Sequence, residues 1–322
     1  MEYKKLGETD LEISRIGFGC WAIGGHGYGK VDDDESVKAV RRALDLGINF
    51  FDTADVYGFG HSEEILSRAL GSHKNKVVIA TKFGVNWDKD GKTYKNCSSK
   101  RIVEALEGSL SRLQMDCIPL YQIHWYDGIT TITEIMETLN KCQKEGKIRY
   151  IACSNLSVEL IFEAFKVHRL ESNQLLYNLV QRGSETDISR CAVELKMGII
   201  VYGTLARGLF SGRYGLDATF VDNDTRREDE NFKGEKLKNN LEWLNKMKEV
   251  GTAYHKSPSQ IAIRWVLENE NVTCAIVGVK NAMQIEENIG ALGWRLTQAD
   301  FNCLTREMTT AEEKESDYFQ EP

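Results

Sequence analysis

Four side chains suited to proton transfer occur within the first 124 residues of the sequence: Asp52, Tyr57, Lys82 and His124. The first two lie in the segment 50–58, which reads Phe-Phe-Asp-Thr-Ala-Asp-Val-Tyr-Gly. A phenol has a pKa of about 10 in water, and it becomes a usable proton donor at neutral pH only where a nearby cation favours the phenolate. Lys82 could supply that cation, and His124 could hydrogen-bond or help protonate a substrate carbonyl oxygen.

Short apolar runs typical of buried parallel strands alternate along the chain with stretches of helical spacing. The period is roughly 30 to 40 residues, as for βα units. Eight such units predict an α/β protein with a (β/α)₈ TIM barrel rather than an open doubly wound sheet. We expect a β-hairpin at 3–16, extra C-terminal helices ending at 300–308, and one domain spanning 1–322. The expected strands are 16–21, 48–52, 77–81, 118–124, 148–153, 174–179, 198–202 and 272–277, and the expected helices are 34–46, 62–70, 98–113, 131–145, 158–167, 188–197, 241–255, 259–268 and 282–292.

The four candidate residues lie where barrel strands should end. Asp52 and Tyr57 lie at and just past the end of the second expected strand, Lys82 follows the third, and His124 ends the fourth. The carboxyl ends of barrel strands meet at one mouth, so these side chains should lie together. A lysine at the end of a buried strand is costly without a counter-charge, which makes Asp52 its expected partner. Asp55, in the same segment, receives no role.

Composition argues against several classes of function. The formal net charge is −7 and no long basic run occurs, which disfavours nucleic acid and anionic membrane surfaces as partners. No stretch approaches the roughly 20 apolar residues of a membrane-spanning helix, and no apolar signal segment follows Met1. We therefore expect a cytoplasmic protein, a monomer or weak homo-oligomer. The eight cysteines are scattered without metal-site spacing, which predicts reduced thiols and no metal.

Three segments together resemble the signatures of the aldo-keto reductases. They read Phe-Asp-Thr-Ala-Asp-Val-Tyr-Gly at 51–58, Ala-Thr-Lys at 80–82 and Gln-Ile-His-Trp at 122–125. The resemblance covers nearly the whole chain and is of the bacterial type. It implies a (β/α)₈ barrel that binds NADPH, or less often NADH, without a Rossmann domain. It also implies that Asp52, Tyr57, Lys82 and His124 form a catalytic tetrad, with Tyr57 as the general acid in reduction and the base in oxidation.

Candidate cofactor ligands follow the strands of the second half of the chain. Ser154 and Asn155 follow the fifth expected strand and Gln174 opens the sixth, where they offer the donors and acceptors that a nicotinamide carboxamide needs. Tyr202 ends the seventh and could stack on the nicotinamide ring. By resemblance, these positions have these roles in the family. Further expected contacts are Gly203, Leu205, Arg207, Gly208 and Arg213 around the pyrophosphate, and Gly278, Lys280, Gln284, Glu287 and Asn288 around the adenosine and its 2′-phosphate.

The sequence favours NADPH over NADH. Lys280 is the one clear cation near the expected 2′-phosphate, at the start of a helix whose N-terminus favours an anion. The chain departs from the family pattern at Thr204, where a proline is commoner, and at Gln284, where some members carry arginine. The segment 17–22 matches G-x-G-x-x-A, but a glycine-rich loop continues to Lys30 before any helix begins, so we do not interpret it as a pyrophosphate loop.

The main hypothesis is an NADPH-dependent carbonyl reductase that converts an aldehyde or ketone to an alcohol, reversibly. One alternative is a cofactor-binding regulatory or partner-binding module with slow turnover. Another is a barrel isomerase or aldolase with Lys82 as a Schiff base, although a lysine paired with Asp52 would stay protonated and be a poor nucleophile. We expect Trp21, Trp87 and Trp125, with Tyr28, to line the substrate mouth. We expect a loop at 85–97 and a polar, charge-rich insertion at 213–240, and both should shape specificity. The substrate itself stays open.

Overall fold

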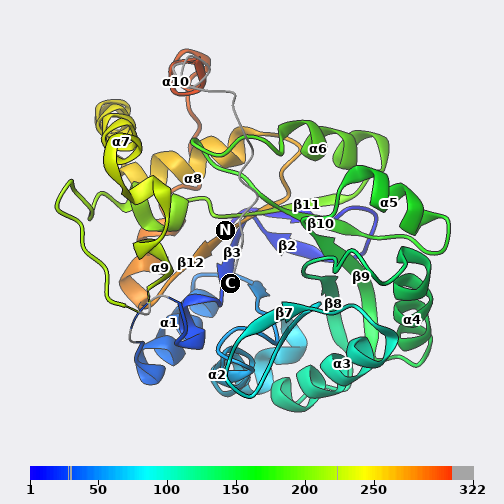
Figure 1. Cartoon of the computed structure of the whole chain (residues 1–322). Helices are drawn as coiled ribbons and strands as arrows, with labels where there is room; N and C mark the ends of the chain where they lie inside the picture. Colours follow the sequence, from blue (N-terminus) through cyan, green and yellow to red (C-terminus); the bar gives the residue numbers. More distant parts are fainter. Residues whose placement is uncertain (28, 30, 223, 307–322) are drawn as a thin grey trace.

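Eight parallel strands follow one another around a closed barrel in chain order, and the last pairs with the first (Figure 1). The structure is a computed structural model that describes residues 1–27, 29, 31–222 and 224–306. The predicted (β/α)₈ barrel is confirmed. Its strands are β3 (Ile16–Gly19), β4 (Phe50–Asp52), β5 (Val78–Phe83), β8 (Ile118–Ile123), β9 (Ile148–Ser154), β10 (Ser172–Leu176), β11 (Gly198–Tyr202) and β12 (Cys274–Gly278).

Helices follow the strands and surround the barrel (Figure 1). Most begin with a side-chain cap of the kind that Ser, Thr, Asp and Asn provide. Ser257 forms a capping box with Gln260 ahead of Pro258 at the first helical position. The helices are α1 (Asp33–Asp45), α2 (His61–Leu70), α3 (Ser99–Leu113), α4 (Ile132–Lys144), α5 (Val158–Phe165), α6 (Glu185–Ser189), α7 (Gly234–Tyr254), α8 (Pro258–Glu268), α9 (Ala282–Ile289) and α10 (Gln298–Arg306).

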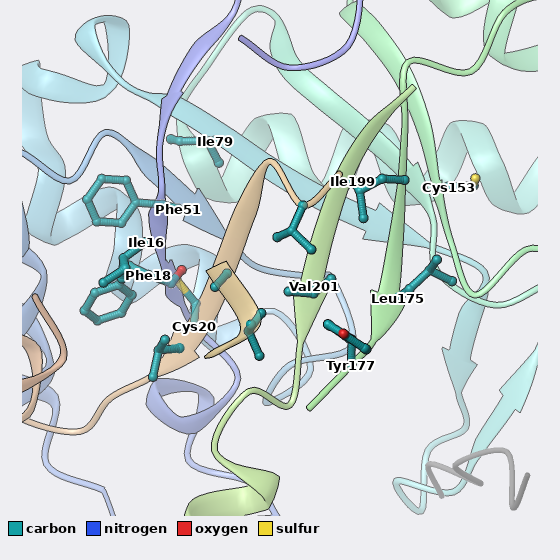
Figure 2. Packing of buried hydrophobic residues seen from close by; sticks show 14 of the residues in the cluster. Ile16, Phe18, Cys20, Phe51, Ile79, Cys153, Leu175, Tyr177, Ile199 and Val201 are labelled. Atoms are coloured by element: carbon teal, nitrogen blue, oxygen red, sulfur yellow. The ribbon is translucent and has the colours of Figure 1, made fainter. Parts of the chain in front are cut away.

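Two apolar clusters hold the fold together. The larger lies between the strands and the surrounding helices, and Figure 2 shows part of it, including Phe18 and Phe51, whose ring centroids are 5.7 Å apart. The smaller fills the barrel interior. There, Leu6, Leu11 and Ile13 of the N-terminal hairpin pack with interior strand residues such as Phe50. The predicted hairpin, β1 (Tyr3–Lys5) and β2 (Glu12–Ser14), therefore closes one end of the barrel.

Several local predictions were wrong. The segment 85–97 is not simply a loop, because β6 (Val85–Trp87) and β7 (Thr93–Lys95) form an antiparallel hairpin. The seventh helix begins at Gly234, within the stretch expected to be an insertion. The prediction missed this start because the first turns of the helix are polar and lack an apolar pattern. In place of one helix at 188–197, α6 is followed by a π-helical turn, Arg190–Glu194. The sixth strand begins at Ser172, so Gln174 lies within it rather than opening it.

Some expectations fall outside the described residues. Tyr28, expected at the substrate mouth, is among them, as are the last two residues of the helix expected at 300–308. The part of that helix that the structure describes belongs to α10. Among the described residues, no helix is long and apolar enough to cross a membrane.

The glycines that imitate a dinucleotide motif serve packing inside the barrel. Gly17 and Gly19 both lie in β3, which leads into a short 3₁₀ helix, Ala22–Gly24, and not directly into an α-helix. A Cβ atom at Gly17 would lie 2.7 Å from a ring carbon of Phe50 and 3.0 Å from the sulfur of Cys274. Gly17 is therefore required because two interior side chains occupy the space above it.

Gly17→Ala should lower the free energy of unfolding by about 1–3 kcal/mol, the usual cost of overpacking a close-packed interior. Gly183→Ala is the matched control, since a Cβ there meets no atom within 4 Å. Urea unfolding followed by far-UV circular dichroism would measure both. Equal stability of the two variants would contradict the packing role of Gly17.

Candidate active site

A layer of polar side chains lies at the carboxyl end of the barrel, above the apolar interior. Alternate strand residues face the same side, so the apolar residues Phe50, Ala80 and Leu120 are each followed, two positions later, by an interior polar residue. These polar residues are Asp52, Lys82 and Gln122. The register places Asp52 beside Ala80 and Lys82 beside Gln122 on neighbouring strands. The sequence pattern alone therefore carries these groups into one buried layer.

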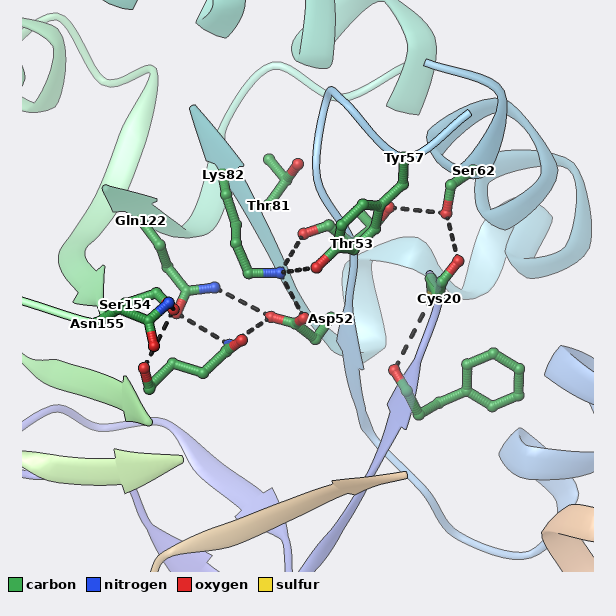
Figure 3. Close-up of polar contacts among 12 residues, drawn as sticks. Cys20, Asp52, Thr53, Tyr57, Ser62, Thr81, Lys82, Gln122, Ser154 and Asn155 are labelled. Atoms are coloured by element: carbon green, nitrogen blue, oxygen red, sulfur yellow. Dashed lines mark hydrogen bonds and ion pairs between the residues drawn. The ribbon is translucent and has the colours of Figure 1, made fainter. Parts of the chain in front are cut away.

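Lys82 is the centre of this layer. Its side chain is fully buried, and its ammonium nitrogen Nζ donates to three oxygens, as Figure 3 shows. The acceptors are Oδ1 of Asp52 at 2.6 Å, the backbone oxygen of Thr53 at 2.9 Å and the phenol oxygen of Tyr57 at 3.1 Å. The three donors of the ammonium group are thus matched by three acceptors. One cation ties the buried carboxylate to the phenol.

Asp52 is held on its other side by two amides. Its Oδ2 atom accepts from Nε2 of Gln122 at 3.0 Å and from Nε2 of Gln174 at 2.8 Å. These bonds satisfy the second carboxylate oxygen, which burial would otherwise make costly. Sequence reasoning assigned no role to Gln122. It stands two positions before His124, and strand alternation could have placed both in the barrel interior.

Aromatic rings flank Tyr57 on two sides. The ring of His124 lies edge-on to it with centroids 5.7 Å apart, and the ring of Trp21 is stacked on it at 6.0 Å. Burial, and then the positive charge of Lys82, lower the pKa of His124 well below its usual range. The imidazole is therefore neutral near pH 7. It is suited to hydrogen bonding, whereas Tyr57 has the cation that supports proton transfer.

The loop that carries Tyr57 lies against the loop after β3. A Cβ atom at Gly58 would collide with the backbone oxygen of Gly24. Gly58 also has a φ of 60°, which a glycine adopts without strain. The loop bearing Trp21 and the loop bearing Tyr57 are thus in direct backbone contact.

A cavity of about 270 Å³ opens beside this layer. Asp52, Tyr57 and His124 line it, as do Trp21 and Trp125, while Lys82 lies beneath. Trp87 does not: its ring packs on Phe59 and under the guanidinium of Arg101. Every residue expected to bind the cofactor lines the cavity, namely Ser154, Asn155, Gln174, Tyr202, Gly203, Leu205, Arg207, Gly208, Arg213, Gly278, Lys280, Gln284, Glu287 and Asn288.

Near Asp52, hydrogen bonds link the expected nicotinamide ligands. The hydroxyl of Tyr202 donates to Oδ1 of Asn155 at 3.0 Å. Nδ2 of Asn155 donates to the hydroxyl of Ser154 at 3.1 Å, and that hydroxyl donates to the backbone oxygen of Gln174. This series of hydrogen bonds continues to Asp52, because the side chain of Gln174 donates to Oδ2 of Asp52. This half of the cavity is therefore connected to the Lys82–Asp52 pair.

A second cation accompanies Lys280 at the far end of the cavity. Arg226 is buried, bonds the carboxylate of Asp224 through Nε at 2.8 Å, and contacts the hydroxyl of Tyr214. Burial lowers the pKa of Lys280, the charge of Arg226 lowers it further, and Asp224 opposes them. Sequence reasoning missed Arg226, because nothing distinguished it within a charge-rich stretch.

Two expected ligands have structural partners as well. Arg207 lies over the ring of Trp21 at 5.8 Å and 3.5 Å from a carboxylate oxygen of Asp229, so its charge is partly compensated within the protein. The side-chain oxygen of Gln284 accepts from the backbone N–H of Lys280 at 2.7 Å. Among the described residues, no group of three or more His, Cys, Asp or Glu side chains is arranged to hold a metal ion.

Comparison with known proteins gives consistent matches. The model of the Aldo/keto reductase family matches residues 15–306. Aldo-keto reductase YhdN of Bacillus subtilis is 38% identical over 93% of this chain and 91% of its own length. The NADH-specific methylglyoxal reductase of Escherichia coli is 32% identical over 96% and 98%. The structure of the glycerol dehydrogenase AKR11B4 from Gluconobacter oxydans is 35% identical, with a TM-score of 0.89 and 99% of each chain covered.

Lys82→Met should destabilise the protein by about 3–5 kcal/mol, because it leaves an ionised carboxylate buried without its counter-ion. The double variant Asp52→Asn, Lys82→Met removes that charge and should recover part of the loss. Urea unfolding at pH 7.5 would measure both. Additive losses in the double variant would show that the two charges do not depend on each other.

Proposed function

The chain belongs to the aldo/keto reductase family, an oxidoreductase family that reduces carbonyl groups with a nicotinamide cofactor, and from this we propose that it reduces a small aldehyde or ketone reversibly with NADPH. The observation that carries the proposal is the 3.1 Å hydrogen bond from Lys82 to the phenol oxygen of Tyr57 at the wall of the cavity. A phenol so placed can give up its proton to an alkoxide, because the ammonium ion stabilises the phenolate left behind.

The residues of the cavity fit a nicotinamide dinucleotide that carries a 2′-phosphate. Amide and hydroxyl groups of Asn155, Ser154 and Tyr202 suit a carboxamide. At the other end, Lys280 and Arg226 are mutually repelling cations that Asp224 offsets in part, and a phosphate between them would relieve that repulsion. Because the Escherichia coli relative is NADH-specific by name, family membership alone does not select NADPH; the two cations are the argument for it.

In the proposed reaction, each protein group has a separate task. NADPH bound in the cavity would supply the hydride. His124, neutral because burial and Lys82 lower its pKa, donates a hydrogen bond that orients the carbonyl oxygen. As the carbonyl oxygen becomes an alkoxide, Tyr57 donates its proton to that oxygen. Lys82 stabilises the phenolate that remains on Tyr57. Asp52 keeps Lys82 charged and takes no proton itself. In oxidation, the phenolate of Tyr57 removes the proton from the alcohol.

The two alternatives find less support. A Schiff-base role requires a neutral lysine, whereas Lys82 is held as an ammonium ion by Asp52 and by two further acceptors. A regulatory module with slow turnover could share the same cavity. No feature of the described residues specifically favours it, and an assay with a panel of aldehydes and ketones separates it from an efficient reductase.

Tyr57→Phe should lower kcat for carbonyl reduction by at least about 100-fold, because the ring stays but the proton donor is lost. NADPH should still bind, as measured by quenching of tryptophan fluorescence, with a Kd close to that of the unaltered protein. Turnover of the variant at the original rate would refute the role of Tyr57, and loss of cofactor binding would point to misfolding of the loop instead.

Lys280→Ala should lower kcat/KM for NADPH by about 10- to 100-fold, because a charge-assisted hydrogen bond is lost. The value of kcat/KM for NADH should change much less. Lys280→Arg, which keeps the charge, is the matched control and should retain most of the preference. Steady-state rates with both cofactors measure the effect. An equal loss with NADPH and NADH would contradict recognition of the 2′-phosphate by Lys280.

A further inference from the structure

Asp55, to which the sequence assigned no role, forms an ion pair with Arg101 beneath the loop that carries Tyr57. We propose that Asp55 is a positioning residue: by pairing with Arg101 it fastens the Tyr57 loop, residues 53–60, to helix α3, and so holds the phenol against Lys82. This inference rests on the proposed role of Tyr57 as the proton donor. It concerns a residue that contacts neither the cavity nor Lys82 through its side chain.

The ion pair is almost fully enclosed. The side chain of Asp55 is 1% exposed and that of Arg101 is 11% exposed. Oδ2 of Asp55 accepts from Nη2 of Arg101. The other carboxylate oxygen, and Nε of Arg101, have no hydrogen-bond partner within the described part of the chain. Burying charges is costly unless they are fully paired. This ion pair is therefore weak evidence for a role in stability, and its position beside Tyr57 indicates a role in holding the loop.

The pair connects three parts of the active-site mouth. Asp55 lies two residues before Tyr57 in a turn whose backbone bonds β5, through N–H of Asp55 to the oxygen of Lys82 at 3.4 Å. Arg101 lies in the first turn of α3, and its guanidinium stands over the ring of Trp87 at 5.5 Å in the β6–β7 hairpin. The loop, α3 and the hairpin are therefore fastened at one point. Trp87, which does not line the cavity, contributes here.

A second buried pair anchors the helix that follows the loop. Glu63, fully buried in the first turn of α2, accepts from the hydroxyl of Thr81 at 2.6 Å and from Nε of Arg112 at 2.7 Å. Helices α2 and α3 lie side by side (Figure 1). Since Glu63 fixes the far end of the loop, Asp55 is the charged anchor nearest to Tyr57 along the chain. Loss of its charge should therefore displace the phenol rather than unfold the region.

The anchor should respond to pH. Burial raises the pKa of Asp55 to about 7. Glu63 adds to this shift, whereas Arg101, Arg112 and the backbone of Val56 oppose it. Below this pH the carboxyl is neutral and the ion pair is lost, so kcat should fall as the pH drops through 7. The groups that face Asp55 are Arg101 and Arg112 from α3, Glu63 from α2 and the phenol of Tyr121 from β8.

Stability should change in the opposite direction. The carboxyl takes up a proton near pH 7 when the protein is folded and near its usual value of 3.8 when it is unfolded. Between these values the folded protein binds more protons, so the free energy of unfolding should decrease as the pH rises from about 4 to 7. A group that only stabilised the fold would not raise activity while lowering stability.

The test compares Asp55→Asn with the unaltered protein, using NADPH and 4-nitrobenzaldehyde as the probe from pH 5.5 to 9. The variant should lose about 10-fold in kcat above pH 7.5, as expected for a misplaced catalytic group, and should lack the inflection near pH 7. Its KM for NADPH should change less than about 2-fold, since no cofactor contact is altered. An unchanged pH profile and kcat would overturn the proposal.

Three further variants separate positioning from general damage. Arg101→Met prevents the ion pair at every pH, so it should lower kcat as Asp55→Asn does and should also lack the inflection near pH 7. Arg101→Lys keeps a cation and should retain part of kcat. Glu268→Gln breaks a remote buried pair of α8, with Arg264 at 3.0 Å, and should leave the profile unchanged. If Glu268→Gln alters the profile as Asp55→Asn does, the effect reflects lost stability and the proposal fails.

Hydrogen exchange distinguishes this proposal from the proposed function. In Asp55→Asn, the backbone amides of residues 55–59 should exchange at least about 10-fold faster than in the unaltered protein, while those of α8 should not. If the unaltered protein reduces no carbonyl compound, the proposed function fails, but faster exchange would still show that Asp55 holds the loop. Unchanged exchange at 55–59 would overturn the positioning role whatever the turnover.

Discussion

A single buried cation governs the arrangement of the site. Lys82 is enclosed at the top of an apolar barrel, where an ammonium ion without partners would be strongly unfavourable. Its partners must therefore come from neighbouring strands and the loop between them, and they do: Asp52 and Tyr57 are bound to the same nitrogen. Gln122 and Gln174 donate hydrogen bonds to the second carboxylate oxygen of Asp52. The requirement to satisfy one charge thus aligns the chemistry of four barrel strands.

The sequence predicted the barrel, and that Asp52, Tyr57, Lys82 and His124 lie together at its mouth, because both follow from short-range patterns. Strand alternation carries Lys82 and Asp52 to the same layer, and glycines and capping residues mark the helix ends near where the structure has them. Register and partner choice are long-range properties. For that reason Gln122, Arg226 and the Asp55–Arg101 pair were not predicted: each depends on which side chain of a distant element packs against it.

The same distinction applies to the wrong boundaries. The polar start of α7 resembled a solvated insertion because a helix on the surface needs little apolar surface of its own. The β6–β7 hairpin was missed because its strands are three residues each and its partners are local. Trp87, expected to contact substrate, instead lies under the guanidinium of Arg101. Aromatic residues near a mouth can support its wall from behind, and composition does not separate the two positions.

The backbone contact between Gly58 and Gly24 bears on how such a protein can diverge. Two loops that touch through glycines cannot be altered separately, since any larger residue on one side moves the other. A mutation that reshapes the Trp21 wall would therefore also disturb Tyr57, and would be lost through inactivity before a new substrate could be selected. Evolutionary change should accumulate more readily at the tip of the β6–β7 hairpin, residues 88–92, which lies outside the cavity lining and carries none of the four candidate residues.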